Sequence, residues 1–276
     1  MSYTIISDSS SDLLSLPGMA YANVPFKIIT DQKEYVDDAA LDVDGMIADL
    51  RAYKGTSKSS CPNIDDWSAA FGDHDHIICI TITSGLSGSN NTANLALKEH
   101  LDAHPEKQGM VIDSLSTGPE NALIIEKLQE MISAKFSLDE IKQKIKEYQA
   151  KTHLIFSLDS LRNLANNGRV STAVAKVAGI LGIRVVGKAS DEGTLEITSK
   201  VRGRDKALAE ILGNMLKTGY AGGKVRIHHC QNEAAAHTLV DMIKQKFKNA
   251  AIKVQETRGL CSFYAESGGL LVGYEG

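Results

Sequence analysis

The chain has 276 residues, of which 43% are hydrophobic and 23% are charged. This balance is typical of a globular protein with one large domain or two medium-sized ones. The formal net charge of −4 provides no broad basic surface, which argues against nucleic acid or an anionic membrane as the main partner. No stretch reaches about 18 apolar residues, and no basic segment precedes a long apolar one at the N-terminus, so we expect neither a membrane span nor export.

Four cysteines are scattered along the chain without a Cys-x-x-Cys pair: Cys61, Cys79, Cys230 and Cys261. This pattern favours a protein of the reducing cytoplasm over a disulfide framework or a zinc site.

In the first half of the chain, short apolar runs alternate with polar loops and amphipathic stretches. Strands are predicted at residues 4–6, 77–83 and 110–112. Helical spacing of apolar residues follows the second and third of these runs, at residues 95–101 and 122–132. This alternation predicts βαβ units, and βαβ units imply a parallel sheet with flanking helices.

The pattern changes near residue 158, and we therefore divide the chain into an N-terminal domain, residues 1–156, and a C-terminal domain, residues 157–276. A helix that begins with a capping box of Ser137 and Glu140 would bridge the two halves. Beyond it, Asp191-Glu192-Gly193 has the composition of a hairpin turn between two strands. Further helices are predicted at residues 160–169, 171–181 and 233–247, and further strands at 224–228, 252–255 and within 268–275. The fold class is therefore α/β, with a parallel-sheet N-terminal domain and a mixed α/β C-terminal domain.

Three loops rich in hydroxyl groups follow the predicted parallel strands: SDSSSD at residues 7–12, TSGLSGSN at 83–90 and DSLSTG at 113–118. In open α/β sheets, ligands bind beyond the carboxyl ends of the strands, near the point where the strand order reverses. The three loops together therefore predict a polar pocket at this edge of the sheet.

The second loop also has features of an anion site. Gly85 and Gly88 permit a ligand to approach the backbone closely, and Ser87 or Ser89 begins a helix. A helix start presents unpaired N–H groups and a partial positive charge, which favour a carboxylate or a phosphate. The alternative is purely structural, because serine commonly caps helices and glycine commonly forms turns.

Known catalytic and nucleotide motifs do not match this loop. A nucleophile elbow requires Gly-x-Ser-x-Gly, but Ser89 stands where the last glycine belongs. A P-loop and a dinucleotide-binding fingerprint are both missing from the sequence. Upstream, in residues 54–71, four hydroxyls precede Pro62 and a predicted amphipathic helix: Thr56, Ser57, Ser59 and Ser60. Helix capping accounts for one of them, and the surplus indicates either a ligand site or a flexible loop.

Six segments of the sequence resemble, in order and spacing, the DegV family of bacterial fatty-acid-binding proteins: DSSSDL, KSSCPN, TSGLSGSNNTA, VIDSLSTG, LRNLANNGRVS and KVRGRDKAL. They span nearly the whole chain. The resemblance implies two α/β domains with one long-chain fatty acid buried between them, and it implies neither a metal nor a cofactor. It also implies a binding protein rather than an enzyme, because members studied as kinase subunits present the acyl carboxylate to a separate fatty acid kinase.

The resemblance extends to individual site residues. Ser59 takes the place of the family's carboxylate-binding threonine, and Ser87 is the second carboxylate donor. Ser60 joins them at the head group. The supporting loop comprises Ser84, Gly85 and Gly88.

Two further positions complete the implied site. Arg169 matches the arginine near the mouth of the family's site, although it could equally belong to a helix C-cap in which Gly168 is the turn residue. Many members carry a histidine near the carboxylate in the C-terminal segment, and Tyr264 is the nearest residue to that position here. We assign no role to His228 and His229, which end a predicted strand.

Burial of the acyl tail would drive binding, since each buried methylene contributes about 0.8 kcal/mol. Apolar residues that could line a tunnel, or could equally belong to the core, are Phe26, Leu161, Leu164, Val174, Val177, Ile180 and Leu181. The basic group Lys200, Arg202 and Arg204 is either a docking surface for a kinase or a solvated face.

Two other functions stay open. An acyl hydrolase or acyltransferase would use Ser87 as its nucleophile, but the sequence offers no evident histidine and aspartate to activate it. A partner-interaction module would hold no lipid.

Overall fold

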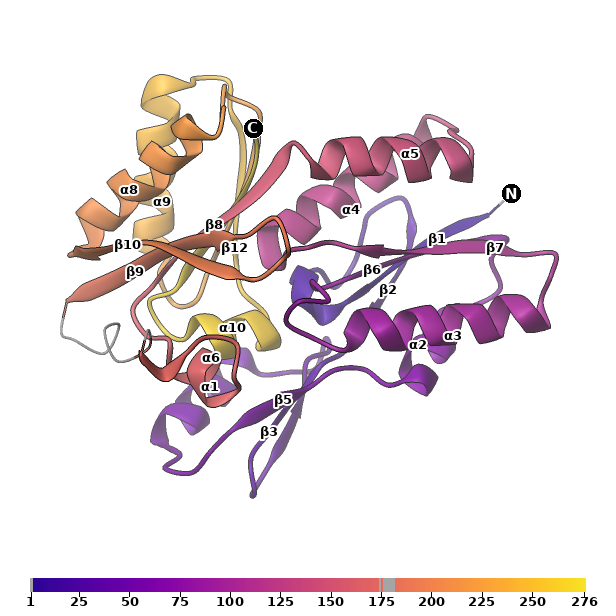
Figure 1. Ribbon diagram of the computed structural model, residues 1–276, viewed down its shortest axis with the longest axis horizontal. Coiled ribbons are helices and arrows are strands. Elements are labelled where there is room, and N and C mark those ends of the chain that lie inside the picture. The colour runs from indigo at the N-terminus through magenta and orange to yellow at the C-terminus, as the bar shows by residue number, and fades with distance from the viewer. Residues whose placement is uncertain (1, 174, 176–181) are drawn as a thin grey trace.

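A four-stranded parallel sheet in the order β2-β1-β6-β7 forms the core of the first half of the chain (Figure 1). The computed structural model describes residues 2–173, 175 and 182–276. The strands of this sheet are β1 (Tyr3–Asp8), β2 (Ala20–Val24), β6 (His76–Thr81) and β7 (Gln108–Asp113). The strand order reverses between β1 and β6, as the predicted ligand site requires.

Helices cover both faces of this sheet, which explains its nearly continuous apolar strands. Ile5 and Ile78 pack on one side, against the helices α4 (Gly118–Ser133) and α5 (Leu138–Gln149). Their neighbours Ile6 and Ile77 pack on the other side, against α2 (Ile64–Ala70) and α3 (Ser89–Ala103). The predicted parallel sheet with flanking helices is thus confirmed.

A mixed six-stranded sheet in the order β10-β9-β8-β13-β11-β12 forms the core of the second half. Its strands are β8 (Thr152–Leu158), β9 (Ile183–Ala189), β10 (Leu195–Arg202), β11 (Lys224–His229), β12 (Ala251–Glu256) and β13 (Leu270–Glu275). One face packs against α8 (Arg204–Lys217) and α9 (Glu233–Lys246). The other face meets α4, the short helix α6 (Arg162–Asn166) and α10 (Gly259–Ala265).

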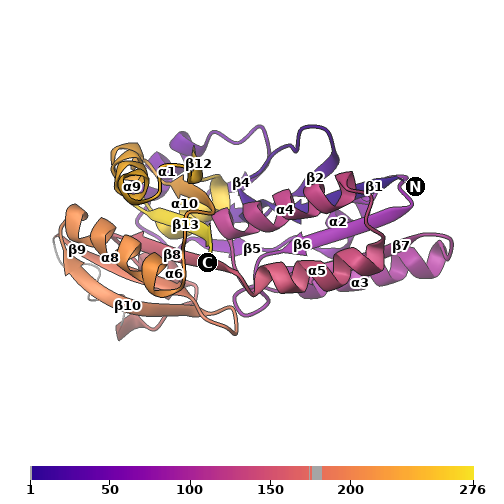
Figure 2. The same ribbon diagram turned by 90° about the horizontal axis from the view of Figure 1, so that it is seen from above.

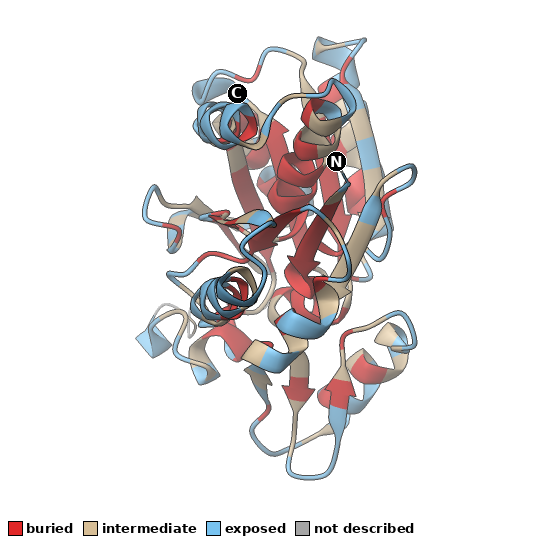
Figure 3. Cartoon of the chain, turned by 90° about the vertical axis from the view of Figure 1, so that its right-hand side faces the viewer, coloured by how far each residue is buried: buried red, intermediate tan, exposed pale blue. Residues whose placement is uncertain are grey.

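Helix α4 lies between the two sheets (Figure 2). Its first eight residues, 118–125, are all buried, and Gly273 of β13 passes so close that a Cβ there would lie 2.6 Å from the backbone nitrogen of Glu120. Farther along the helix, Glu126 accepts hydrogen bonds from Arg226 of β11 and, at 2.9 Å, from the Nζ atom of Lys253. Figure 3 shows that buried residues concentrate on the strands of the sheets and on the helices between them.

A small third sheet, in the order β4-β3-β5, was not predicted from the sequence. Its strands are β3 (Lys27–Ile29), β4 (Glu34–Val36) and β5 (Lys58–Ser60), and helix α1 (Val43–Ala52) packs beside them. Three residues are too few to display the alternation that predicts a strand. This sheet matters for the site, because β5 carries Ser59.

Two local sequence signals predicted structure correctly. The capping box of Ser137 and Glu140 begins α5, and the residues 191–193 turn the chain from β9 into β10, with Gly193 at φ +73°. The domain boundary placed after residue 156 falls inside β8, which pairs with β13 from Thr152 to Ser157. The helix predicted over residues 171–181 lies, except for 171–173 and 175, outside the described residues.

Among the described helices, none is both long enough and apolar enough to cross a membrane.

Candidate ligand cavity

A cavity lies beyond the carboxyl ends of β6 and β7, where the loops of the first sheet face the second sheet. Ile82, Leu86 and Ser87 follow β6, and Thr117 follows β7. Most of the wall is apolar: Phe26, Ile82, Leu86, Leu154, Phe156, Leu158, Leu164, Leu195, Leu260, Ala265 and Leu271. The polar lining residues are Ser59, Ser87, Thr117, Arg169, Cys261 and Tyr264. An apolar hollow with a few polar groups is typical of a site for an amphiphilic small molecule.

Ser59 and Tyr264 meet in this cavity. Their hydroxyl oxygens are 2.7 Å apart, although 205 residues separate them in sequence. The alternation of β5 turns Ser59 inward and leaves its neighbours Lys58 and Ser60 exposed. Burial raises the pKa of Tyr264 above its usual value, so the tyrosine keeps the proton that it can donate.

Ser87 lies in the turn that precedes α3. Its Oγ atom accepts a hydrogen bond from the backbone nitrogen of Ser89 at 3.2 Å, and its own hydroxyl hydrogen can point to a ligand. The turn is held against the second sheet by a close backbone contact, because a Cβ on Gly85 would lie 3.1 Å from the carbonyl oxygen of Gly193. This close approach explains the need for glycine at position 85.

Arg169 takes part in a helix C-cap and also lines the cavity. Gly168 has a φ of +74°, and the backbone nitrogen of Arg169 donates to the carbonyl of Leu164 at 2.8 Å, which is a helix C-cap. The side chain nevertheless lines the cavity, and its Nε atom donates to the carbonyl of Leu86 at 3.1 Å. The cap therefore holds a guanidinium beside the turn that carries Ser87.

Four of the predicted site residues are not among those that line the cavity: Ser60, Ser84, Gly85 and Gly88. Ser60 lies on the exposed side of β5, and its Oγ atom donates weakly to the carbonyl of Cys61 at 3.4 Å. Ser84 is exposed, and its backbone nitrogen binds the carboxylate of Asp113 at 3.1 Å. Neighbouring residues of an extended or turning segment point in different directions, so Ser59 and Ser87 line the cavity while Ser60 and Ser84 do not.

The predicted tunnel residues are only partly placed. Phe26 and Leu164 line the cavity, whereas Leu161 is buried in the apolar cluster beside it. Val174, Val177, Ile180 and Leu181 lie outside the described residues. Sequence reasoning missed Leu154, Phe156 and Leu158, whose alternation in the segment THLIFSL was a usable signal for one face of a strand.

The first serine-rich loop supports the site without lining it. Asp8 is buried, and its carboxylate accepts hydrogen bonds from Ser10 at 2.5 Å, from Ser89 at 2.7 Å and from the backbone nitrogen of Ile82 at 3.0 Å. Burial raises the pKa of Asp8 despite these partners. The loop thus ties the end of β1 to the chain that follows β6.

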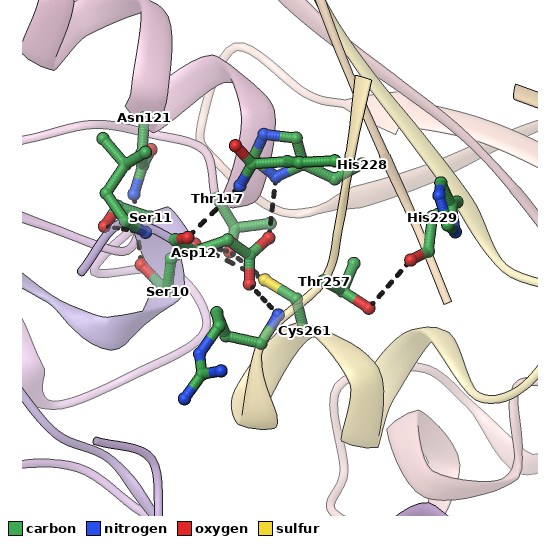
Figure 4. A network of polar contacts seen from close by, with 12 residues as sticks. Ser10, Ser11, Asp12, Thr117, Asn121, His228, His229, Thr257 and Cys261 are labelled. Atoms are coloured by element: carbon green, nitrogen blue, oxygen red, sulfur yellow. Dashed lines mark hydrogen bonds and ion pairs between the residues drawn. The ribbon is translucent and has the colours of Figure 1, made fainter. Parts of the chain in front are cut away.

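Asp12, at the end of the same loop, joins the two halves of the molecule (Figure 4). Its carboxylate lies 2.7 Å from the Nδ1 atom of His228 on β11, and it accepts a hydrogen bond from the backbone nitrogen of Arg258 at 2.7 Å. Cys261 and Thr117, which line the cavity, both lie against the carbonyl of Ser10 in this network. No role is predicted for His228 from the sequence, but through this contact it links the two sheets.

A second carboxylate of the first half holds the start of α10. Asp37 accepts hydrogen bonds from the backbone nitrogens of Gly259 at 2.7 Å and Leu260 at 2.8 Å. Burial raises the pKa of Asp37 to about 6. Because α10 also carries Tyr264, Asp12 and Asp37 together position one wall of the cavity.

The polar lining residues can donate hydrogen bonds to an acceptor group of a ligand, and a long apolar surface lies beside them. Hydroxyls and a guanidinium satisfy an oxyanion head group, and the leucine-rich wall accommodates an alkyl tail. Within the described part of the chain, neither a histidine nor a carboxylate lines the cavity, and no cluster of three potential metal ligands occurs.

Comparisons with known proteins agree with this geometry. A family model described as an uncharacterised protein of the DegV family matches residues 2–275. A DegV domain-containing protein of Streptococcus gordonii is 44% identical over 279 residues, which cover 100% of this chain and 99% of that protein.

Two solved structures are similar over essentially their whole length. A DegV family protein from Eubacterium eligens, loaded with heptadecanoic acid, has 45% identity and a TM-score of 0.98, with 99% of each chain covered. The Streptococcus pneumoniae Fatty Acid Kinase (Fak) B3 protein, loaded with linoleic acid, has 43% identity and a TM-score of 0.98, with 100% of this chain and 99% of that chain covered.

Proposed function

This chain belongs to the DegV family, and on that premise we propose that it binds one long-chain fatty acid in the cavity between its two sheets. The observation that carries the proposal is the pairing of a polar cluster, Ser59, Tyr264, Ser87 and Arg169, with an otherwise apolar wall. The fatty acids bound in the two similar structures support the same ligand class.

The carboxylate would lie against the hydroxyls of Ser59, Ser87 and Tyr264. The Ser59–Tyr264 hydrogen bond can reorient so that each hydroxyl donates to a ligand oxygen, because either oxygen can act as donor. Arg169 adds a positive charge beside this cluster. A buried carboxylate is costly without such partners, and hydrogen bonds to a charged group are among the strongest in proteins.

The tail would supply most of the affinity. A chain of about 16 carbons buried at about 0.8 kcal/mol per methylene yields roughly 12 kcal/mol of gross driving force, before the cost of ordering the ligand. The strand β8 offers Leu154, Phe156 and Leu158 to this tail on one face.

We also propose that the bound acid is presented to a separate fatty acid kinase in the cytoplasm. The similarity to the Fak B3 protein supports a kinase partner, and four free cysteines support a reducing compartment. The exposed residues Lys200, Arg202 and Arg204, where β10 leads into α8, offer a basic docking surface for that partner. Among them, Arg204 already contacts Asp205 at 3.2 Å.

A hydrolase that uses Ser87 is the competing function. Its serine would require a general base within hydrogen-bond reach, and the described residues around the cavity supply neither histidine nor carboxylate. We therefore favour binding over catalysis.

Solvent extraction of the purified protein, followed by mass spectrometry, tests the proposal. We expect close to one intact fatty acid per chain, and the delipidated protein should take up a long-chain acid again. An empty protein that takes up none would contradict the proposal, and hydrolysis of an added acyl ester that depends on Ser87 would favour the enzyme.

A further inference from the structure

A wide groove adjoins the cavity on the side away from Ser59 and Tyr264. We call it the side groove; it has a volume of about 660 Å³ and lies between the edge strand β7, helix α5 and the first residues of β8. Among the residues that line it are Met110, Ile112, Ile145 and His153. Among the residues that the structure describes, Leu154 alone lines both the side groove and the cavity, and its exposed fraction is 2%.

The strand β8 fixes the order of residues along the cavity. Leu154, Phe156 and Leu158 share one face of this strand, and a rise of about 3.3 Å per residue places the first and last of them roughly 13 Å apart. The far end of the strand leads into α6, where Asn163 binds the carbonyl of Phe263 at 2.8 Å and Asn167 binds the carbonyl of Ser57 at 3.2 Å.

These two contacts locate the head-group end. Phe263 directly precedes Tyr264, and Ser57 lies two residues before Ser59, so the hydroxyl pair lies beside the Leu158 end of β8. Leu154 is at the opposite end, next to Thr152 and His153, which line the side groove. A ligand whose carboxylate is held by the hydroxyl pair therefore points its tail toward Leu154.

We propose that Leu154 is the end wall of the lipid cavity and sets the longest acyl chain that the protein accepts. The inference rests on the proposed function, because it requires a fatty acid whose carboxylate is held by Ser59 and Tyr264. A tail that reaches Leu154 has to stop or bend there. Without this side chain, the last carbons would continue into the side groove and contact Met110, Ile112 and Ile145.

Binding of saturated acids of increasing length to the delipidated full chain tests the inference. For the unmodified protein, affinity should rise with length and then stop rising at one chain length. Leu154→Ala should move this limit to chains at least two carbons longer and raise the affinity ratio of the long to the short acid about 16-fold, since each newly buried methylene is worth about fourfold. Leu154→Phe should move the limit in the opposite direction.

Leu158→Ala is the matched control. Leu158 lies on the same strand and face, is similarly buried with an exposed fraction of 4%, and lines the cavity but not the side groove. This variant should weaken binding of all lengths alike and leave the limit in place. Thermal melting verifies that each variant is folded, and Leu154→Val provides a milder shift if the alanine variant is not.

The possible failures are distinct. A limit that stays in place in folded Leu154 variants, or that moves equally in Leu158→Ala, would overturn the assignment of Leu154 as the wall while leaving lipid binding intact. An unmodified protein that binds no acid of any length would instead contradict the proposed function.

Discussion

Two hydroxyl-rich regions of this protein have opposite roles. We call residues 7–12, at the end of β1 and just beyond it, the closed loop. Its serine hydroxyls bind protein atoms: Ser10 donates to Asp8, and Ser9 accepts from the backbone nitrogen of Phe26. In the cavity, Ser59 and Ser87 hold hydroxyls that line an apolar hollow. Hydroxyl density alone therefore does not identify a binding site. A binding site is identified by hydroxyl groups that face a cavity and can donate to a ligand there.

The largest effect should come from breaking the closed loop. Asp12→Ala leaves the Nδ1 atom of His228 and the backbone nitrogen of Arg258 without their acceptor, and we expect the free energy of unfolding to fall by about 3 kcal/mol or more. Urea denaturation of the delipidated protein measures this loss. Ser59→Ala, in the cavity, should change stability by less than about 1 kcal/mol.

The backbone of Asp12 calls for a second variant, because its φ is +59°. Asp12→Asn tolerates this left-handed conformation and keeps one acceptor oxygen, so it should lose less stability than Asp12→Ala. Equal stability of the native protein, Asp12→Ala and Asp12→Asn would show that the closed loop is not the link between the sheets.

A dependence of stability on pH should come from the buried carboxyls and not from the cavity. Burial raises the pKa of Glu120 to about 7 and that of Asp37 to about 6. A raised pKa in the folded state means that folding takes up protons. The contribution of the two carboxyls to the free energy of unfolding is therefore complete below about pH 4 and is lost as the pH rises through 6 and 7. The contribution of these two carboxyls to the free energy of unfolding should therefore decrease between pH 5 and pH 8.

Glu120→Gln isolates one part of this dependence. The amide oxygen can still accept the hydrogen bond from Thr152, which is 2.7 Å long in the native protein, but it does not ionise. At pH 8 the variant should be more stable than the native protein by on the order of 2 kcal/mol, with a flatter pH profile. Parallel pH profiles for the two proteins would contradict this account.

In the cavity, Ser87→Ala should weaken fatty acid binding by about 1.5–3 kcal/mol, or roughly 10- to 150-fold, because it removes a donor from a buried carboxylate. Calorimetric titration measures the change. A matched fatty alcohol should lose less than the acid, and equal losses would mean that Ser87 acts through the structure of its turn. Ser84→Ala, in the same turn but exposed, is the control and should bind normally.

The smallest effect on lipid affinity should come from the basic residues of the second half. Arg202→Glu combined with Arg204→Glu should leave the dissociation constant unchanged, because tail burial does not depend on this surface. The same variant should abolish kinase-dependent phosphorylation of the bound acid at low salt, since docking depends on surface charge. A parallel fall in lipid affinity would place these arginines in the lipid site, and no change in either measurement would make them a solvated face.

Local patterns in the sequence predicted much of the fold. Ser137 with Glu140 and the turn at residues 191–193 act over a few residues, so their chemistry is visible in the sequence itself. The pairing of Asp12 with His228 joins residues 216 apart, and no local pattern encodes such a contact. The inward orientation of Ser59 and the outward orientation of Ser60 depend on β5, a strand too short to predict.

The site was therefore predictable only in part. Resemblance to a family placed Ser59, Ser87, Arg169 and Tyr264, and the structure brings these four residues to one cavity. The apolar wall was harder to predict, because tunnel residues and core residues have the same composition. Leu154 differs from any other buried leucine only in its position beside the cavity.

Helix α4 has a consequence for how the chain can behave as a whole. Its apolar residues complete the interior of the parallel sheet, while its first turns pack against β13 of the mixed sheet. Neither sheet can therefore keep a dry interior after the other has unfolded. We therefore expect the two halves to unfold as one cooperative unit rather than as independent domains.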